Sequence, residues 1–156
     1  MIENELLENK IIVYRIEDEE YAISVQYVGS IERVLPITRV PRTPDFVKGV
    51  INLRGVVTPV IDLKKRFYNI ETKFTEQTRI IIVSSGDVTI GLIVDSANDV
   101  IDIQPDQIEP APESIGSRVV DYISGVIKLD NRLFILLDLE KVLNKSELND
   151  IRVLEG

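Results

Sequence analysis

Short apolar runs separated by charged or glycine-containing turns recur along the chain. Residues 10–16 and 21–25 are rich in β-branched and aromatic side chains, and the acidic run 17–20 lies between them. Residues 79–83 and 88–94 repeat this arrangement around a Ser-Ser-Gly-Asp turn. Such pairs of runs predict two β-hairpins, with the acidic run as the solvated tip of the first.

The stretch 46–67 predicts a third hairpin. Two apolar runs flank Asn52-Leu53-Arg54-Gly55. Gly55 can take a positive φ at little cost, and Asn52 tolerates one better than most residues do. The tight turn therefore presents one charged side chain, that of Arg54. Arg54 is either an ordinary exposed turn residue or an anchor for a protein–protein contact, a role in which arginine is over-represented.

The same stretch recurs 76 residues later, at positions 122–143, without a gap. Seven of the 22 positions are identical, whereas composition alone would give roughly 1 to 2. The identical pairs are Gly49/Gly125, Val50/Val126, Ile51/Ile127, Leu53/Leu129, Asp62/Asp138, Leu63/Leu139 and Lys65/Lys141. Asn131 stands where Gly55 stands and is predicted to take a left-handed conformation. The two earlier hairpins match more weakly at a shift of 69 residues, so a unit of two hairpins occurs twice.

Proline-containing connectors and short helices complete each unit. The connectors contain Pro36, Pro41 and Pro44 in the first unit and Pro105, Pro110 and Pro112 in the second. The first is predicted to be extended, because proline cannot donate a hydrogen bond to a strand ladder, and the second has a similar proline spacing. The spacing of Val28, Ile31 and Val34 predicts a short helical turn. Asp62 and Asp138 each precede a short apolar pattern and are predicted to cap a helical turn.

The repeat predicts a mainly-β fold with two lobes. The run 134–137 is continuously apolar, which is typical of a strand buried on both faces, as between packed lobes. We therefore expect two small antiparallel barrels, closed or nearly closed, that share a core. Closure removes the edges that short strands would otherwise expose.

Composition excludes several kinds of chemistry. The chain of 156 residues contains no cysteine and no histidine, so disulfides, thiolate chemistry and a Ser-His-Asp arrangement are impossible. The net charge of −8 disfavours nucleic acid and an anionic membrane as direct partners. No apolar run approaches a membrane span, and residues 1–5 lack the basic start of a signal peptide. We expect a cytoplasmic protein without a cofactor.

Three aspartates are the best candidates for a ligand site. Asp95, Asp99 and Asp102 lie close together in the sequence, but no loop motif supports a metal site and solvated acids are the simpler interpretation. A polar pocket with perturbed carboxylates around Asp95 and Asp99 would instead indicate a stand-alone small-ligand-binding barrel or an unusual enzyme. A third alternative is a fragment of a larger signalling protein.

Several blocks resemble the CheW family of bacterial chemotaxis coupling proteins. The main block is Phe46–Gly55 with its Asn-Leu-Arg-Gly turn, followed by Pro59–Leu63. Further similar blocks are Ile37–Pro41, Gly91–Asp95, Pro110–Pro112 and Asp130–Leu133. The resemblance covers residues 10–145 as one domain, leaving tails at 1–9 and 146–156. It implies two SH3-like five-stranded β-barrel lobes and no catalysis.

The resemblance also implies partners and their sites. Family members bridge the cytoplasmic tips of chemoreceptors and the regulatory domain of the histidine kinase CheA, and the isolated chain is expected to be a monomer. The positions matching the receptor-facing region are Val28, Ser30, Asn52, Leu53, Arg54, Val94 and Val100. The positions matching kinase-facing or ring-forming contacts are Arg79, Glu109, Pro110, Ala111 and Pro112.

One position departs from the family pattern. Family members often carry glutamate where Ser30 stands, and that glutamate pairs with the arginine matching Arg54. Glu32, two residues further on, is the candidate substitute for it here.

Overall fold

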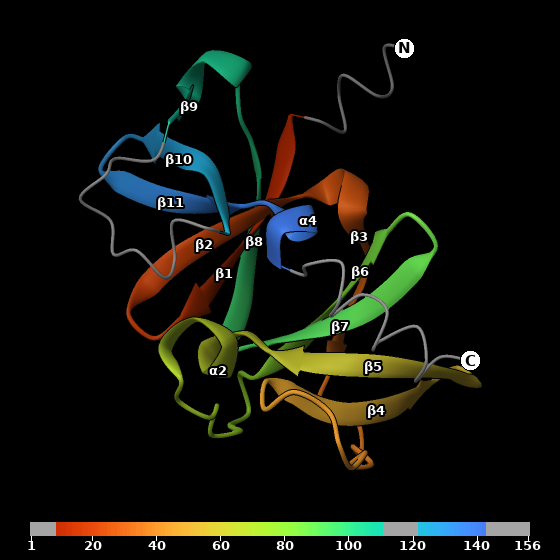
Figure 1. Cartoon of the computed structure of the whole chain (residues 1–156). Coiled ribbons are helices and arrows are strands. Elements are labelled where there is room, and N and C mark those ends of the chain that lie inside the picture. Colours follow the sequence, from red (N-terminus) through yellow and green to blue (C-terminus); the bar gives the residue numbers. More distant parts are fainter. Residues whose placement is uncertain (1–8, 111–121, 143–156) are drawn as a thin grey trace.

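The computed structural model describes residues 9–110 and 122–142, which form two packed β-sheets (Figure 1). The first sheet has the strand order β8-β1-β2-β11-β10-β9, and the second has the order β3-β6-β7-β5-β4. The strands of the first sheet are β1 Lys10–Ile16, β2 Glu19–Ser24, β8 Ser96–Asp102, β9 Ile108–Glu109, β10 Ile123–Leu129 and β11 Arg132–Leu137. Those of the second are β3 Val28–Arg33, β4 Val47–Leu53, β5 Val56–Asp62, β6 Arg79–Ser85 and β7 Val88–Val94.

The predicted mainly-β fold with two lobes is confirmed, with two refinements. The second sheet has five strands, and the first has six because the two-residue strand β9 is added at its edge. Each sheet also contains one parallel pair, β2 with β11 and β5 with β7, so the expectation of purely antiparallel pairing was wrong. Closure of the sheets into full barrels stays a prediction.

The parallel pairs arise because the two sequence repeats exchange hairpins. Hairpin β1–β2 opens the first repeat but pairs with β11 of the second, whereas β6–β7 opens the second repeat but pairs with β5 of the first. Equivalent residues meet at the two junctions: Leu136 lies opposite Ala22, and Val60 lies opposite Gly91. Each lobe is therefore built from both halves of the chain.

The described residues form three apolar clusters, and the largest of them joins the two lobes. The largest contains buried residues of both sheets, among them Ile12 and Ile23 of the first sheet and Leu92 and Val94 of the second. A smaller cluster around Phe134 lies within the first sheet, and another around Ile80 lies within the second. The predicted shared core is present, and burial of its apolar surface favours the packed arrangement of the two lobes.

An aromatic stack runs through the shared core. Tyr14 stacks on Tyr21 at a ring-centroid distance of 5.8 Å, and Tyr21 stacks on Phe67 at 5.7 Å. Phe67 also stacks on Tyr122 at 5.3 Å. Because Tyr21 belongs to the first sheet and Phe67 to the helix that follows β5, this stack joins the two lobes directly.

Among the described residues, four short helices interrupt the strands: η1 Val25–Tyr27, α2 Leu63–Tyr68, η2 Pro105–Gln107 and α4 Leu139–Val142. The carboxylate of Asp62 accepts a hydrogen bond from the Lys65 amide at 3.3 Å, and that of Asp138 accepts one from the Glu140 amide at 3.1 Å. Both predicted caps are therefore confirmed. In the described ranges, no helix combines the length and apolar character that crossing a bilayer requires.

The helical turn predicted from Val28, Ile31 and Val34 was wrong. Only Val25–Tyr27 forms a turn of 3₁₀-helix, which Ser24 caps through the Gln26 amide. Strand β3 begins at Val28 because it pairs along β6, a strand some fifty positions away in the sequence. Long-range pairing overrides a local apolar spacing in this segment.

The first proline connector lies against the edge of the second sheet. Thr38 and Val50 exchange two backbone hydrogen bonds, each 2.8 Å long. Gly49 makes this approach possible, because a Cβ at its position would collide with the carbonyl oxygen of Thr38. The equivalent Gly125 has the same role beside Glu109 of β9, and both glycines sit at a register shift in their strands.

Replacing Gly49 with alanine should lower the free energy of unfolding by about 2 kcal/mol or more, because the new methyl group overpacks against fixed backbone and the residue keeps a positive φ. Gly86 is the matched control: its φ is +63°, yet nothing lies within 4 Å of the position that a Cβ would take there. Gly86→Ala should cost only about 1 kcal/mol, the conformational part of the effect. Urea unfolding of both variants measures the difference, and equal losses would contradict the collision.

Candidate functional site

The turn between β4 and β5 presents Arg54 at the end of the second sheet. Arg54 has φ +51° and Gly55 has φ +88°, as a two-residue turn matching the twist of a hairpin requires. The side-chain oxygen of Asn52 accepts a hydrogen bond from the Gly55 amide at 2.7 Å. In the second repeat the left-handed residue is Asp130, with φ +55°, and not Asn131 as predicted. The left-handed position therefore matches Arg54.

An ion pair fixes the orientation of Arg54. Its Nη2 lies 2.8 Å from Oε2 of Glu32 on β3, so the pair joins the hairpin turn to the opposite edge strand of the same sheet. A hydrogen bond from Ser30, together with the guanidinium of Arg54, lowers the pKa of Glu32. Glu32 thus takes the place predicted for it as the partner of Arg54, and Ser30 supports it.

Arg54 remains accessible although it is paired. Its side chain is 69% exposed, whereas that of Glu32 is 19% exposed. Two exposed apolar residues, Val56 and Val57, directly follow the turn at the start of β5, whereas exposed Ile31 lies on the face of β3 opposite to Glu32. A cation held in place beside exposed apolar groups is typical of a protein-binding surface. We call Glu32, Arg54, Val56 and Val57 the Arg54 surface.

Sequence reasoning missed the two apolar members of this surface, Val56 and Val57, as well as the exposure of Ile31. A usable signal was present, because Val56 and Val57 are adjacent and successive strand residues face opposite sides of a sheet. Strand β5 pairs with β7 only from Val60 onward, so its first residues project beyond that neighbour. The exposure of Ile31 follows from its place on an edge strand, which was predicted as a helical turn.

The other residues predicted to face a receptor occupy different environments. Val28 is partly buried at the start of β3. Val100 is 62% exposed on β8, the edge strand of the first sheet. Val94 is only 1% exposed and packs in the shared core, so it offers no surface to a partner. The prediction that Val94 contacts a receptor was therefore wrong. The sequence of an apolar strand end does not show whether another strand buries its side chain.

The described residues among those predicted to face the kinase belong to different sheets. Arg79 begins β6 in the second sheet, and its Nη1 donates to the carbonyl oxygens of Glu76 at 2.7 Å and Thr78 at 2.8 Å. Glu109 and Pro110 are exposed at the edge of the first sheet. Ala111 and Pro112 lie outside the described residues.

The three candidate ligand aspartates each face a cation. Asp95 lies 2.9 Å from Nζ of Lys64, Asp99 lies 3.3 Å from Arg132, and Asp102 lies 2.7 Å from Lys10. Within residues 9–110 and 122–142, no three metal-ligating side chains gather at one point. The arrangement indicates separate ion pairs rather than a shared ligand site.

Lys64 connects the lobes electrostatically. Its ammonium contacts Asp95 and also lies 3.3 Å from Glu17 at the tip of the first hairpin. Burial lowers the pKa of Lys64, but hydrogen bonds and charge interactions with Asp95 and Glu17 outweigh this effect and raise it. The backbone amide of Glu17 also donates to Asp95 at 2.8 Å. The cluster ties helix α2 to the tip of hairpin β1–β2.

Comparison with known proteins places this geometry in a family. The model of the CheW-like domain matches residues 10–147. The chemotaxis protein CheW of Bacillus subtilis is 48% identical to this chain over 137 residues, and the match covers 88% of each chain. The chemotaxis protein CheW of Klebsiella aerogenes is 36% identical over 144 residues, and the match covers 92% of this chain and 87% of the relative. The crystal structure of the scaffolding protein TtCheW from Thermoanaerobacter tengcongensis superposes with a TM-score of 0.81 at 35% identity, covering 90% of this chain and 95% of that one. The chain therefore belongs to the CheW family.

Proposed function

We propose that this protein is a non-catalytic adaptor that couples the cytoplasmic tips of chemoreceptors to the regulatory domain of the histidine kinase CheA. Family membership supports this role, since the relatives are named chemotaxis proteins and one solved relative is a scaffolding protein. The observation that carries the proposal is Arg54, which Glu32 holds in place while 69% of its side chain stays exposed.

The receptor is proposed to bind on the Arg54 surface. Arginine beside apolar groups is the kind of residue that dominates the energetics of protein interfaces. Asn52 and Leu53 hold the turn at the end of β4, and Ser30 supports Glu32 from β3. Val28 on β3 and exposed Val100 on β8 would extend the contact, whereas buried Val94 supports it from within the core.

The kinase is proposed to bind elsewhere, around Glu109 and Pro110 with Arg79 as a further candidate. Glu109 and Pro110 are exposed on the first sheet, whereas Arg54 belongs to the second. An adaptor has to bind two proteins at once, and Glu109 and Pro110 permit this because they lie on the other sheet from Arg54.

The amino-acid composition supports a non-catalytic role. The chain has no histidine or cysteine, the residues that most often act as general base or nucleophile near neutral pH. Asp95, Asp99 and Asp102 are each engaged by a cation.

Calorimetric titration against the regulatory domain of a chemotaxis kinase tests the adaptor. We expect saturable one-to-one binding, followed by binding of a receptor cytoplasmic fragment to the preformed complex. The control is Arg54→Glu, which should bind the kinase domain like the unmodified protein. Absence of heat at several temperatures, or displacement of the kinase domain by the receptor fragment, would contradict the proposal.

A further inference from the structure

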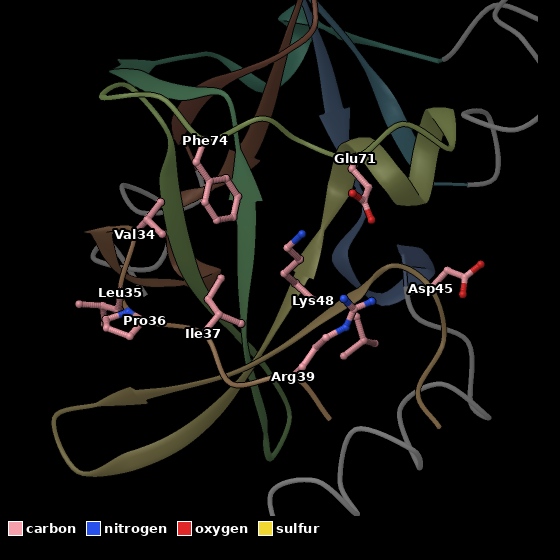
Figure 2. Close-up of a pocket in the computed structure, with 10 residues that line it drawn as sticks. Val34, Leu35, Pro36, Ile37, Arg39, Asp45, Lys48, Glu71 and Phe74 are labelled. Carbon is pink, nitrogen blue, oxygen red and sulfur yellow. The ribbon is translucent and has the colours of Figure 1, made fainter. Parts of the chain in front are cut away.

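A groove of about 570 Å³ lies between the first proline connector, β4 and the loop after α2 (Figure 2). Leu35, Pro36 and Ile37 of the connector and Phe74 of the loop give it an apolar lining. The Phe74 side chain is 42% exposed, which is unusual for a phenylalanine inside a domain. The groove therefore offers an apolar surface that the described residues leave uncovered.

Charged side chains surround this apolar lining. Figure 2 shows Arg39 and Lys48 with Asp45 and Glu71 around the groove. The ammonium of Lys48 lies 5.7 Å from the centre of the Phe74 ring. An occupant that matches this groove needs apolar side chains with charged groups of both signs between them.

Both walls of the groove are held by hydrogen bonds. The connector is fixed to β4 by the two bonds between Thr38 and Val50. On the other side, the buried carboxylate of Asp62 accepts bonds from the Thr72 amide at 2.8 Å and the Thr72 hydroxyl at 2.6 Å. The groove is thus preformed, which lowers the entropic cost of binding an occupant.

The last described helix is linked by contacts to residues that neighbour this groove in the sequence. Helix α4 ends at Val142, whose carbonyl oxygen accepts a hydrogen bond from Nη2 of Arg66 at 2.9 Å. The guanidinium of Arg66 lies over the ring of Phe46 at 4.3 Å. Phe46 stands between Asp45 and Val47, which both line the groove. Whatever follows Val142 therefore starts within a few side chains of it.

The segment that follows has the composition the groove requires. Residues 147–155 read ELNDIRVLE, with Leu148, Ile151 and Leu154 at intervals of three. Glu147, Asp150 and Glu155 can pair with Arg39 and Lys48, and Arg152 can pair with Asp45 or Glu71. Leu148 is six positions beyond Val142, a reach of roughly 20 Å in extended chain. We propose that residues 147–155 bind in this groove of the same molecule.

The remaining segments outside the described ranges are poorer candidates. The chain before Asn9 starts from the first sheet, because the carbonyl oxygen of Asn9 accepts a bond from the Ile103 amide at 2.7 Å. Residues 111–121 connect β9 to β10, so both of their ends belong to the first sheet. The groove lies in the second sheet's lobe, and the segment after Val142 starts beside Arg66 of α2, which follows β5 of that sheet.

This intramolecular contact stands independently of the proposed adaptor role. Residues 147–155 would compete with any other protein for the apolar lining of the groove. The contact would thus act as a competitive, built-in occupant whose local concentration is set by a short tether.

Paramagnetic relaxation tests the contact directly, because the chain lacks cysteine. The variant Asn149→Cys is given a nitroxide spin label, and the backbone amides are observed by NMR. We expect loss of signal at Ile37, Lys48 and Phe74, with unchanged signal at the control hairpin tip Asp130 of the first sheet. Unchanged signals at all three groove positions would overturn the proposal.

Two further samples separate the alternatives. Adding Leu148→Glu, Ile151→Glu and Leu154→Glu to the labelled chain should restore the groove signals, because the apolar groups no longer fit. Mixing spin-labelled chain without isotope with isotope-labelled chain without spin label should leave all signals unchanged. Persistent signal loss in the first sample, or signal loss at the groove in the second, would overturn the proposal; the latter would assign the groove to a second copy of the chain.

Discussion

Arg54→Glu is expected to weaken binding of a receptor cytoplasmic fragment by roughly thirtyfold or more, equivalent to about 2 kcal/mol. The substitution removes the exposed cation and places a carboxylate beside Glu32, where the native ion pair measures 2.8 Å. Stability should change by less than about 1 kcal/mol, because this pair is largely exposed and solvent screens it. Calorimetric titration of the fragment measures the affinity, and this prediction rests on the proposed function.

Two variants make the Arg54 result specific. Arg33→Glu, on the exposed side of β3, carries the same change in net charge and should leave the affinity nearly unchanged. The double variant Arg54→Glu with Glu32→Arg restores an ion pair with reversed polarity, so it should recover stability but not receptor binding. Equal weakening by Arg33→Glu would show a general charge effect, and native affinity of Arg54→Glu would remove the Arg54 surface from the receptor site.

Phe67→Ala is expected to lower the free energy of unfolding by about 3–5 kcal/mol, as truncation of a buried aromatic side chain does. Phe67 is 1% exposed and stacks on both Tyr21 and Tyr122. Its removal leaves a cavity at the point where the two lobes meet, so the loss affects both sheets. Urea unfolding followed by circular dichroism measures it.

Phe74→Ala is the matched control for this substitution. It removes the same side chain from a site that is 42% exposed, and the expected loss is about 1 kcal/mol or less. The loss in the free energy of unfolding for Phe67→Leu should lie between the losses of these two variants. This variant can replace Phe67→Ala in the comparison if Phe67→Ala is too unstable to purify. Equal losses for Phe67→Ala and Phe74→Ala would show that the stack does not hold the lobes together.

Local patterns predicted much of this fold because the responsible interactions are local. Residues Gly49 and Gly125 recur at the same place in the two predicted repeats, and Asp62 and Asp138 cap helices through amides two or three residues away. The exposed Arg54 followed from its place in a tight turn. Each of these features depends on a few neighbouring residues, which a single sequence displays.

Features that depend on distant partners could not be predicted in the same way. The parallel pairing of Leu136 with Ala22 depends on two segments more than a hundred positions apart, and hairpin chemistry says nothing about it. The burial of Val94 and the exposure of Ile31 likewise depend on which strands come to lie beside them. For the charge partner of Arg54, the sequence offered Glu32 as a substitute for the family glutamate at position 30. The structure shows that Glu32 forms the ion pair.

The exchange of hairpins between the repeats has a consequence for how the chain folds during synthesis. All strands of the second sheet lie within residues 28–94, so this lobe can form as soon as that segment has left the ribosome. Hairpin β1–β2 is made first, yet its partners β8 and β11 are made later. Hairpin β1–β2 therefore cannot complete its sheet until β11 has been synthesised, and its apolar side chains remain exposed until then. The first lobe is thus the part of the molecule that most needs protection from aggregation in the cell.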